Sequence, residues 1–141
     1  MTEQAKEKLR YKGKTYSILA EPLESYLSKS TKRKGLIPPN TACWRGYYGS
    51  WKVKYNKLYL IKLEAYIENY KKVEMDYFFP DEKEVFADWF SGEIIIIDDD
   101  NMSIGGAFYS HIIGDYLSLK FKNGELFERK LIKNQTNEIL P

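Results

Sequence analysis

The sequence has very little cysteine or histidine, with one of each among its 141 residues. A single cysteine, Cys43, excludes an internal disulfide, so the fold does not depend on an oxidising compartment. Cys43 and His111 together supply too few soft ligands for a zinc site, and nothing in the sequence brings them together as a catalytic pair. We therefore expect no metal, no cofactor and no catalytic residue.

The sequence also lacks a strong charge of either sign and any long apolar run. Its 22 Lys and Arg against 20 Asp and Glu leave a net charge of only +2, which argues against a protein that mainly coats nucleic acid. No window approaches the roughly 18 apolar residues of a membrane span, and the opening MTEQAKEKLR lacks the apolar stretch of a signal peptide. We expect a cytoplasmic protein without membrane contact, folded as one domain over 1–141, with 1–8 and 134–141 frayed.

Motifs for phosphate and calcium are missing as well. Gly105-Gly106 stands in neither a GxxxxGK[ST] nor a GxGxxG context, so a bend between strands is the better interpretation. The run DDDN at 98–101 fails as an EF-hand loop, because Met102 and Tyr109 stand where oxygen ligands are needed. Its aspartates are typical of residues that shield an aggregation-prone strand.

Aromatic residues, in contrast, are abundant. They make up 16% of the chain, with 12 Tyr, 7 Phe and 3 Trp. Such rings favour half-buried sheet surfaces and are enriched in binding patches. The composition therefore predicts β-structure and a recognition surface together.

Turn residues predict two hairpins. In LRYKGKTYSIL, at 9–19, Gly13 supplies the positive φ that a tight turn requires. At 116–132, Asn123-Gly124 is the strongest turn signal in the chain, and no single loop length places all apolar residues on one face, which predicts a bulge.

Helical signals are few. Pro22 starts a short segment in which Leu23, Tyr26 and Leu27 share one helical face. Residues 65–80 fit both the helical and the strand period of apolar residues, and we interpret them as the end of a strand followed by a short helix.

The segment 43–63 predicts two or three strands. A two-residue turn at Asn56-Lys57 places Trp51 and Val53 on a common core face. In VFADWFSGEIIII, at 85–97, a turn at Ser91-Gly92 pairs the aromatic stretch with the isoleucines. Four consecutive isoleucines leave no polar face, so they predict a strand covered on both sides near the middle of the sheet.

These patterns predict one mainly β domain of roughly six to eight antiparallel strands with one or two short helices. An antiparallel β sandwich or a partly open barrel fits them, and an α+β fold is the alternative.

A buried carboxylate is predicted at Asp88, because aromatic residues and isoleucines surround it in the sequence. Burial of a carboxylate requires a cation or several donors. Arg45 lies in an equally aromatic stretch and forms bidentate pairs with carboxylates. We therefore hypothesise an Arg45–Asp88 pair that fixes the packing of two hairpins, and we favour a structural role over a functional one. The functional version adds a ligand- or partner-binding cleft walled by Trp44, Tyr47, Tyr48 and Trp89.

A basic loop within 28–40 offers a different site. Lys29, Lys32, Arg33 and Lys34 are suited to phosphate contact, and nearby rings are suited to stacking on bases. Charged residues on a solvated loop are common, so nucleic-acid binding through 29–34 is the weaker interpretation.

Four stretches resemble a family of small uncharacterised bacterial proteins: PLESYL, WRGYYGSWKVKYNKLYLIKL, VFADWFSGEI and FKNGELFERK. The chain departs from that family in its lysine-rich insert around 64–74 and in its IIII-DDDN run. The resemblance implies a stand-alone bacterial module and no activity, cofactor or catalytic residue.

From these observations we expect a non-enzymatic interaction module that recognises or neutralises a protein partner through an aromatic-rich surface. The alternative is a small-molecule or hydrolase site around Arg45 and Asp88. Nucleic-acid binding through the basic loop is the second alternative, and the oligomeric state is left open.

Overall fold

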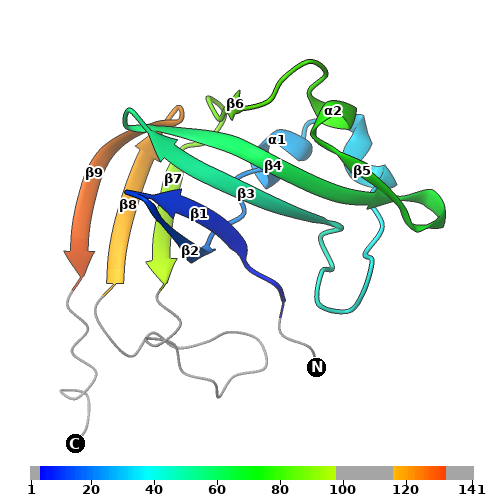
Figure 1. The fold of residues 1–141 in the computed structure, drawn as a ribbon, viewed down its shortest axis with the longest axis horizontal. Coiled ribbons are helices and arrows are strands. Elements are labelled where there is room, and N and C mark those ends of the chain that lie inside the picture. The colour runs from blue at the N-terminus through cyan, green and yellow to red at the C-terminus, as the bar shows by residue number, and fades with distance from the viewer. Residues whose placement is uncertain (1–3, 98–115, 133–141) are drawn as a thin grey trace, which may run out of the picture.

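The computed structural model describes residues 4–97 and 116–132 (Figure 1). The strands in these residues are β1 (Glu7–Tyr11), β2 (Lys14–Leu19), β3 (Tyr47–Lys54), β4 (Lys57–Ile67), β5 (Lys71–Glu74), β6 (Val85–Phe86), β7 (Gly92–Ile97), β8 (Tyr116–Lys122) and β9 (Glu125–Ile132). The helical segments are α1 (Glu24–Leu27), η1 (Thr31–Gly35), η2 (Glu68–Tyr70) and α2 (Met75–Phe78).

Seven of the strands form a barrel in the order β3-β1-β2-β7-β8-β9-β4, which closes where β3 pairs with β4. β5 and β6 extend the sheet by pairing with β4. The pairings are antiparallel except that β1 runs parallel to β3. The mainly β fold with short helices is therefore confirmed, in its barrel form.

Both hairpins predicted from turn residues are confirmed. β1 and β2 pair around a turn in which Lys12 and Gly13 have φ of 50° and 82°. β8 and β9 pair around Asn123 and Gly124, which also have positive φ, and their register shifts after Lys120. Positive φ at both central residues matches the turn to the twist of the flanking strands.

The turn between β3 and β4 was predicted one residue too late. It consists of Tyr55 and Asn56, with φ of 55° and 59°, so that Lys57 belongs to β4. Leu58 consequently lies opposite Val53, where Tyr55 was expected. Because the register differs by two residues, Trp51, Leu58 and Leu60 stay on the predicted core face, and Tyr55 is exposed at the turn.

The predicted hairpin at 85–97 is wrong. β6 pairs with β4, and β7 lies between β2 and β8. The isoleucine run therefore lies in the interior of the sheet, as predicted, but Ile94 and Ile96 are buried while Ile95 is half-buried. β7 pairs with β2 on one edge and with β8 on the other, and these pairings together cover its whole length. β6 pairs with β4 at only two positions.

One apolar cluster fills the barrel and continues under the helices. Leu23 and Leu27 bury one face of α1, as the helical spacing predicted. Tyr26 packs against Phe79, directly after α2, with ring centroids 4.9 Å apart. The largest fully buried side chains are Trp51, Tyr47, Phe121, Leu9, Ile18, Leu23, Leu27, Leu58, Leu60, Leu63, Ile94 and Leu119.

The prediction that residues 1–8 are frayed is wrong from Gln4 onward. Glu7 begins β1, and the backbone N–H of Ala5 donates to the carbonyl of Ala42 at 2.7 Å. The DDDN run, Gly105-Gly106, His111 and the tail 134–141 lie outside the described residues. No helix within 4–97 and 116–132 is both long and apolar enough to cross a membrane.

Candidate functional site

Arg45 lies in the turn that leads into β3, and this turn directs its side chain inward. Gly46 follows with φ of 85°, a conformation that favours glycine, and its N–H donates to the carbonyl of Cys43 at 3.2 Å. A Cβ at Gly46 would also crowd Leu36, at 3.0 Å from its Cβ. Cys43 is buried, and its thiol donates to the carbonyl of Tyr47.

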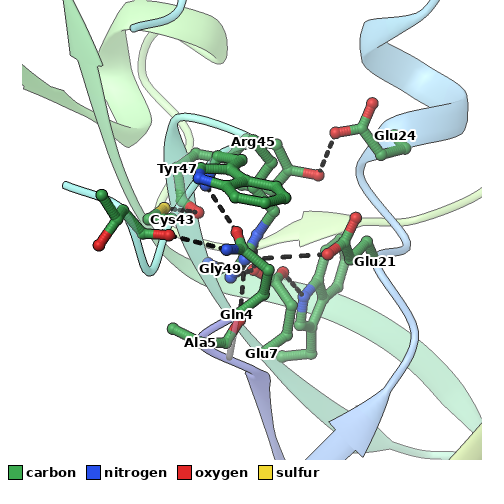
Figure 2. Close-up of polar contacts among 12 residues, drawn as sticks. Gln4, Ala5, Glu7, Glu21, Glu24, Cys43, Arg45, Tyr47 and Gly49 are labelled. Carbon is green, nitrogen blue, oxygen red and sulfur yellow. Dashed lines mark hydrogen bonds and ion pairs between the residues drawn. The ribbon is translucent and has the colours of Figure 1, made fainter. Parts of the chain in front are cut away.

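The partner of Arg45 is Glu7 in β1 (Figure 2). Glu7 Oε2 accepts hydrogen bonds from Arg45 Nε at 3.1 Å and from Arg45 Nη2 at 2.8 Å. The same oxygen accepts from the N–H of Gly49 at 2.9 Å, and Oε1 accepts from Trp51 Nε1 at 2.9 Å. Arg45 Nη1 donates to the carbonyl of Ala5 at 2.8 Å. The carboxylate thus joins β1, β3 and the turn before β3.

Gly49 makes room for this arrangement. A Cβ at Gly49 would overlap Oε1 of Glu7 and lie 3.2 Å from Trp51 Nε1. Glycine at this position therefore allows the carboxylate to approach the backbone N–H of β3. Burial raises the pKa of the Glu7 carboxyl above its usual value, although Arg45, Trp51 and Gly49 each act to lower it. Four convergent donors match an ionised carboxylate, since a protonated one would bring a hydrogen without an acceptor.

The Glu7–Arg45 cluster is closed to ligands. Both side chains are buried, and within the described residues every buried polar side-chain atom has a hydrogen-bond partner. Removing one partner of such a pair leaves an uncompensated charge inside the protein. The cluster therefore holds the amino-terminal strand to the barrel.

The predicted pair of Arg45 with Asp88 is wrong. Asp88 is exposed in a turn after β6, where its N–H donates to the carbonyl of Phe86. Its aromatic neighbours Phe86, Trp89 and Phe90 are half-buried, whereas Asp88 itself is exposed. The strand alternation of Glu7, Leu9 and Tyr11 was the signal for the true partner, because it places Glu7 on the same inward face as Leu9.

The four rings expected around Arg45 do not line one cleft. Trp44 is exposed, Tyr47 is buried, and Tyr48 is half-buried. The Arg45 guanidinium lies 5.3 Å from the ring of Tyr47 and 5.8 Å from that of Tyr48. Trp89 lies elsewhere, against Tyr26 of α1, and donates to the carbonyl of Pro22 at 2.8 Å.

Half of the predicted basic loop serves the fold. Lys32 donates to the carbonyl of Tyr77 and lies 4.5 Å from that ring. Arg33 pairs with Glu24 at 3.2 Å and donates to the carbonyl of Arg45. Only Lys29 and Lys34 project as exposed cations from this loop, a sparse electrostatic footprint for nucleic acid.

A hollow of about 410 Å³ lies on β3 and β4, lined by Tyr48, Ser50, Lys62, Glu64 and Tyr66. Three of its lining residues have hydrogen-bond partners. The Tyr66 hydroxyl donates to Glu64 Oε2 at 2.6 Å, and this hydrogen bond raises the pKa of Tyr66 to about 12. Asn40 donates to the hydroxyl of Tyr48 at 3.2 Å. Both rings of this hollow, Tyr48 and Tyr66, are half-buried and therefore offer little exposed aromatic surface.

A second hollow, the β9 groove, has strongly exposed aromatic rings in its lining. It has a volume of about 460 Å³ and lies between the β1–β2 turn, the β3–β4 tip and β9. Tyr55 and Phe127 are its most exposed rings, at 84% and 64% of their surface. The lining residues are Tyr11, Lys12, Val53, Tyr55, Asn56, Leu126, Phe127, Glu128 and Arg129.

The groove exists because the barrel closes incompletely at this seam. β9 pairs with β4 only at Lys57 and Glu125, and Figure 1 shows β9 leaving the β3–β4 tip directly after its start. Two backbone bonds strengthen the contact, of which one runs from the N–H of Leu126 to the carbonyl of Asn56 at 2.8 Å. Further along, the Arg129 side chain crosses the seam and donates to the hydroxyl of Tyr11 at 2.8 Å.

Tyr55 is held in an unfavourable conformation without compensation from packing. Its φ of 55° lies in the left-handed region, which is uncommon for a bulky side chain. The cost is about 1–2 kcal/mol for an ordinary L residue, and an exposed ring recovers little of it by burial. Conformations of this kind cluster at functional sites but also occur in ordinary tight turns, and the exposed Tyr70 has one outside the groove.

The electrostatics of the groove favour anions. Among the described residues, neither Lys12 nor Arg129 has a carboxylate partner within ion-pair distance. Glu128, on the same wall, is paired with Lys120 at 3.4 Å. Lys130 is exposed beside it. The groove therefore combines exposed rings with unneutralised cations.

Comparison of the chain with models of protein families, with curated proteins and with solved structures finds no match. The resemblance to a bacterial family stays a prediction. No group of three or more Cys, His, Asp or Glu within the described part of the chain is arranged to hold a metal ion.

Proposed function

We propose that this chain is a non-enzymatic interaction module that recognises a protein partner through the β9 groove. The observation that carries the proposal is the presence of two exposed rings, Tyr55 and Phe127, in one groove beside unneutralised cations. Aromatic residues and arginine are the residues most enriched where proteins bind proteins.

The position of the rings supports a recognition role. Tyr55 stands at the tip of a tight hairpin, and Phe127 is the additional residue at the register shift of β9, between partners of Lys120 and Phe121. Each ring lies next to strand-paired residues, Lys54 before Tyr55 and Leu126 and Glu128 around Phe127, so contact with a partner costs little additional ordering of the main chain. Tyrosine and phenylalanine lose few rotamers for the area that they bury.

Capture from an extract of the source cells tests the proposal when it is compared across variants. The groove variant carries Tyr55→Asn and Phe127→Ser. The control is Tyr70→Asn, because Tyr70 also has a positive φ, of 58°, and 67% exposure but lies outside the groove. A photo-crosslinker at Glu128 in the otherwise native chain identifies the bound protein directly.

The proposal expects one protein to be captured near stoichiometrically by the native chain and by the Tyr70→Asn control. The groove variant should retain at most about a tenth of it, the loss expected for a contact worth more than 1.4 kcal/mol. Equal capture by the groove variant, or no crosslink from position 128, contradicts the proposal.

A further inference from the structure

The outer edge of β9 carries backbone groups that pair with no described strand. β9 pairs with β8 from Glu125 to Ile132, but with β4 only at Glu125. Beyond Leu126 no backbone bond joins its other edge to any residue of 4–97 or 116–132. An edge of this length presents a row of N–H and C=O groups suited to an added strand.

The side chains of β9 only partly protect this edge. Charged residues and a bulge are common means of preventing edge-to-edge aggregation, and β9 has both. However, Phe127 and Leu131 are also exposed, at 64% and 54% of their surface. Exposed apolar side chains on an unpaired edge increase its affinity for an added strand, so the edge is suited to binding.

The charges beside the edge define what such a strand should carry. Lys12 on the β1–β2 turn and Arg129 on β9 line the groove without a carboxylate partner among the described residues. Glu128 is neutralised by Lys120. An approaching strand therefore gains from carboxylates opposite these cations and from apolar side chains opposite Phe127 and Leu131.

We infer that the β9 groove binds an extended, acidic segment of a partner protein, which adds to β9 as a strand and places apolar side chains against Tyr55 and Phe127. This inference rests on the proposed function and specifies its partner. The main-chain bonds of the added strand supply affinity, while the groove selects the side chains.

Single-stranded nucleic acid is the competing occupant, since it also favours rings and cations. The open strand edge favours a peptide, because a nucleic acid lacks the alternating donors and acceptors that match such an edge.

Selection from a display library of random peptides of about ten residues, the length of a long strand, tests the inference on the whole protein. Enriched peptides should combine carboxylates with apolar residues. The best binder is then synthesised in three forms: unmodified, N-methylated at alternate amides along one edge, and N-methylated at the intervening amides. Strand addition uses one edge of the peptide, so one methylated form should lose at least about tenfold in affinity and the other should not.

Variants of the protein locate the site. Lys12→Asp keeps a residue that tolerates the positive φ of 50° at this turn position and should weaken binding of the acidic peptide. The Tyr55→Asn, Phe127→Ser variant should bind weakly, and Tyr70→Asn should bind normally. Circular dichroism of each variant verifies that it is folded.

The outcomes separate this inference from the proposed function. If both methylated forms bind as well as the unmodified peptide but the groove variant does not bind, strand addition is wrong and the interaction module stands. If no peptide is enriched, or the groove variant binds all of them, the inference is wrong, and capture by the groove variant decides the proposed function separately. If a thymidine oligonucleotide bound the groove more tightly than the selected peptide, the occupant would be nucleic acid and the inference would be wrong. A dimer in light scattering that dissociates on Phe127→Ser would replace the peptide by a second copy of the chain.

Discussion

Glu7 and Arg45, 38 residues apart in the chain, form a buried ion pair in which Nη2 and Oε2 are 2.8 Å apart. The pair anchors β1 to the start of β3, the only parallel junction among the described strands. It therefore determines whether the amino-terminal strand can close the barrel, and its role is structural.

Arg45→Ala should destabilise the protein by about 3–5 kcal/mol, because it leaves the Glu7 carboxylate buried without its cation. Asp88→Ala should change the free energy of unfolding by no more than about 0.5 kcal/mol, since Asp88 is exposed. Urea denaturation measures both. Equal destabilisation by the two variants would contradict this assignment of the partner of Arg45.

Gly49→Ala should cost about 1–3 kcal/mol, because the added methyl group overlaps the Glu7 carboxylate inside a packed region. Gly35→Ala is the matched control, since a Cβ there meets nothing within 4 Å and no positive φ is required. Thermal denaturation of the two variants compares them. If Gly49→Ala were as stable as Gly35→Ala, the carboxylate would not occupy the position described.

Stability should fall as pH rises above about 10, the usual pKa of tyrosine. Burial raises the pKa of the Tyr47 hydroxyl, as do the neighbouring Glu7 and Glu24. The folded protein therefore keeps a proton that the unfolded chain loses, and unfolding becomes more favourable by about 1.4 kcal/mol per pH unit for this group. Urea midpoints between about pH 8 and 11 measure the slope, and Tyr47→Phe should reduce it. An unchanged slope in Tyr47→Phe would show that Tyr47 ionises normally.

Tyr55→Asn should leave the protein as stable as before or more stable by about 1 kcal/mol, because asparagine tolerates the left-handed backbone that Tyr55 adopts. The same substitution at Tyr70 should have a similar effect, since it also has a positive φ and is exposed. Urea denaturation checks both variants. A loss of more than about 1 kcal/mol at Tyr55 would mean that the ring serves the fold, and the argument for a binding role would fail.

Much of the fold could be predicted from local signals. Gly13 and Asn123-Gly124 determine hairpins through backbone conformations that few residues adopt, and both turns were located correctly. The isoleucine run predicted an interior strand because no polar face remained. These signals depend on neighbouring residues alone, so a single sequence was sufficient.

The candidate site could not be predicted in the same way, because it depends on which distant strands meet. The aromatic neighbours of Asp88 in the sequence led to its prediction as the partner of Arg45, and Glu7 was not predicted to contact it. The parallel pairing of β1 with β3 brings Glu7 next to Arg45. The β9 groove was missed for a related reason: it forms where β9 fails to pair with β4, and Tyr55 was assigned to a strand instead of the turn.

Amide hydrogen exchange of the protein with and without its captured partner, or the selected peptide, locates the surface that binds. New protection should be concentrated in β9 beyond Leu126 and at the β3–β4 tip, where the groove lies. Protection concentrated instead at the hollow of Tyr48 and Tyr66, or at the basic loop 29–34, would contradict this prediction. Strong protection of the outer β9 amides in the free monomer would contradict it as well, because the edge would already be paired.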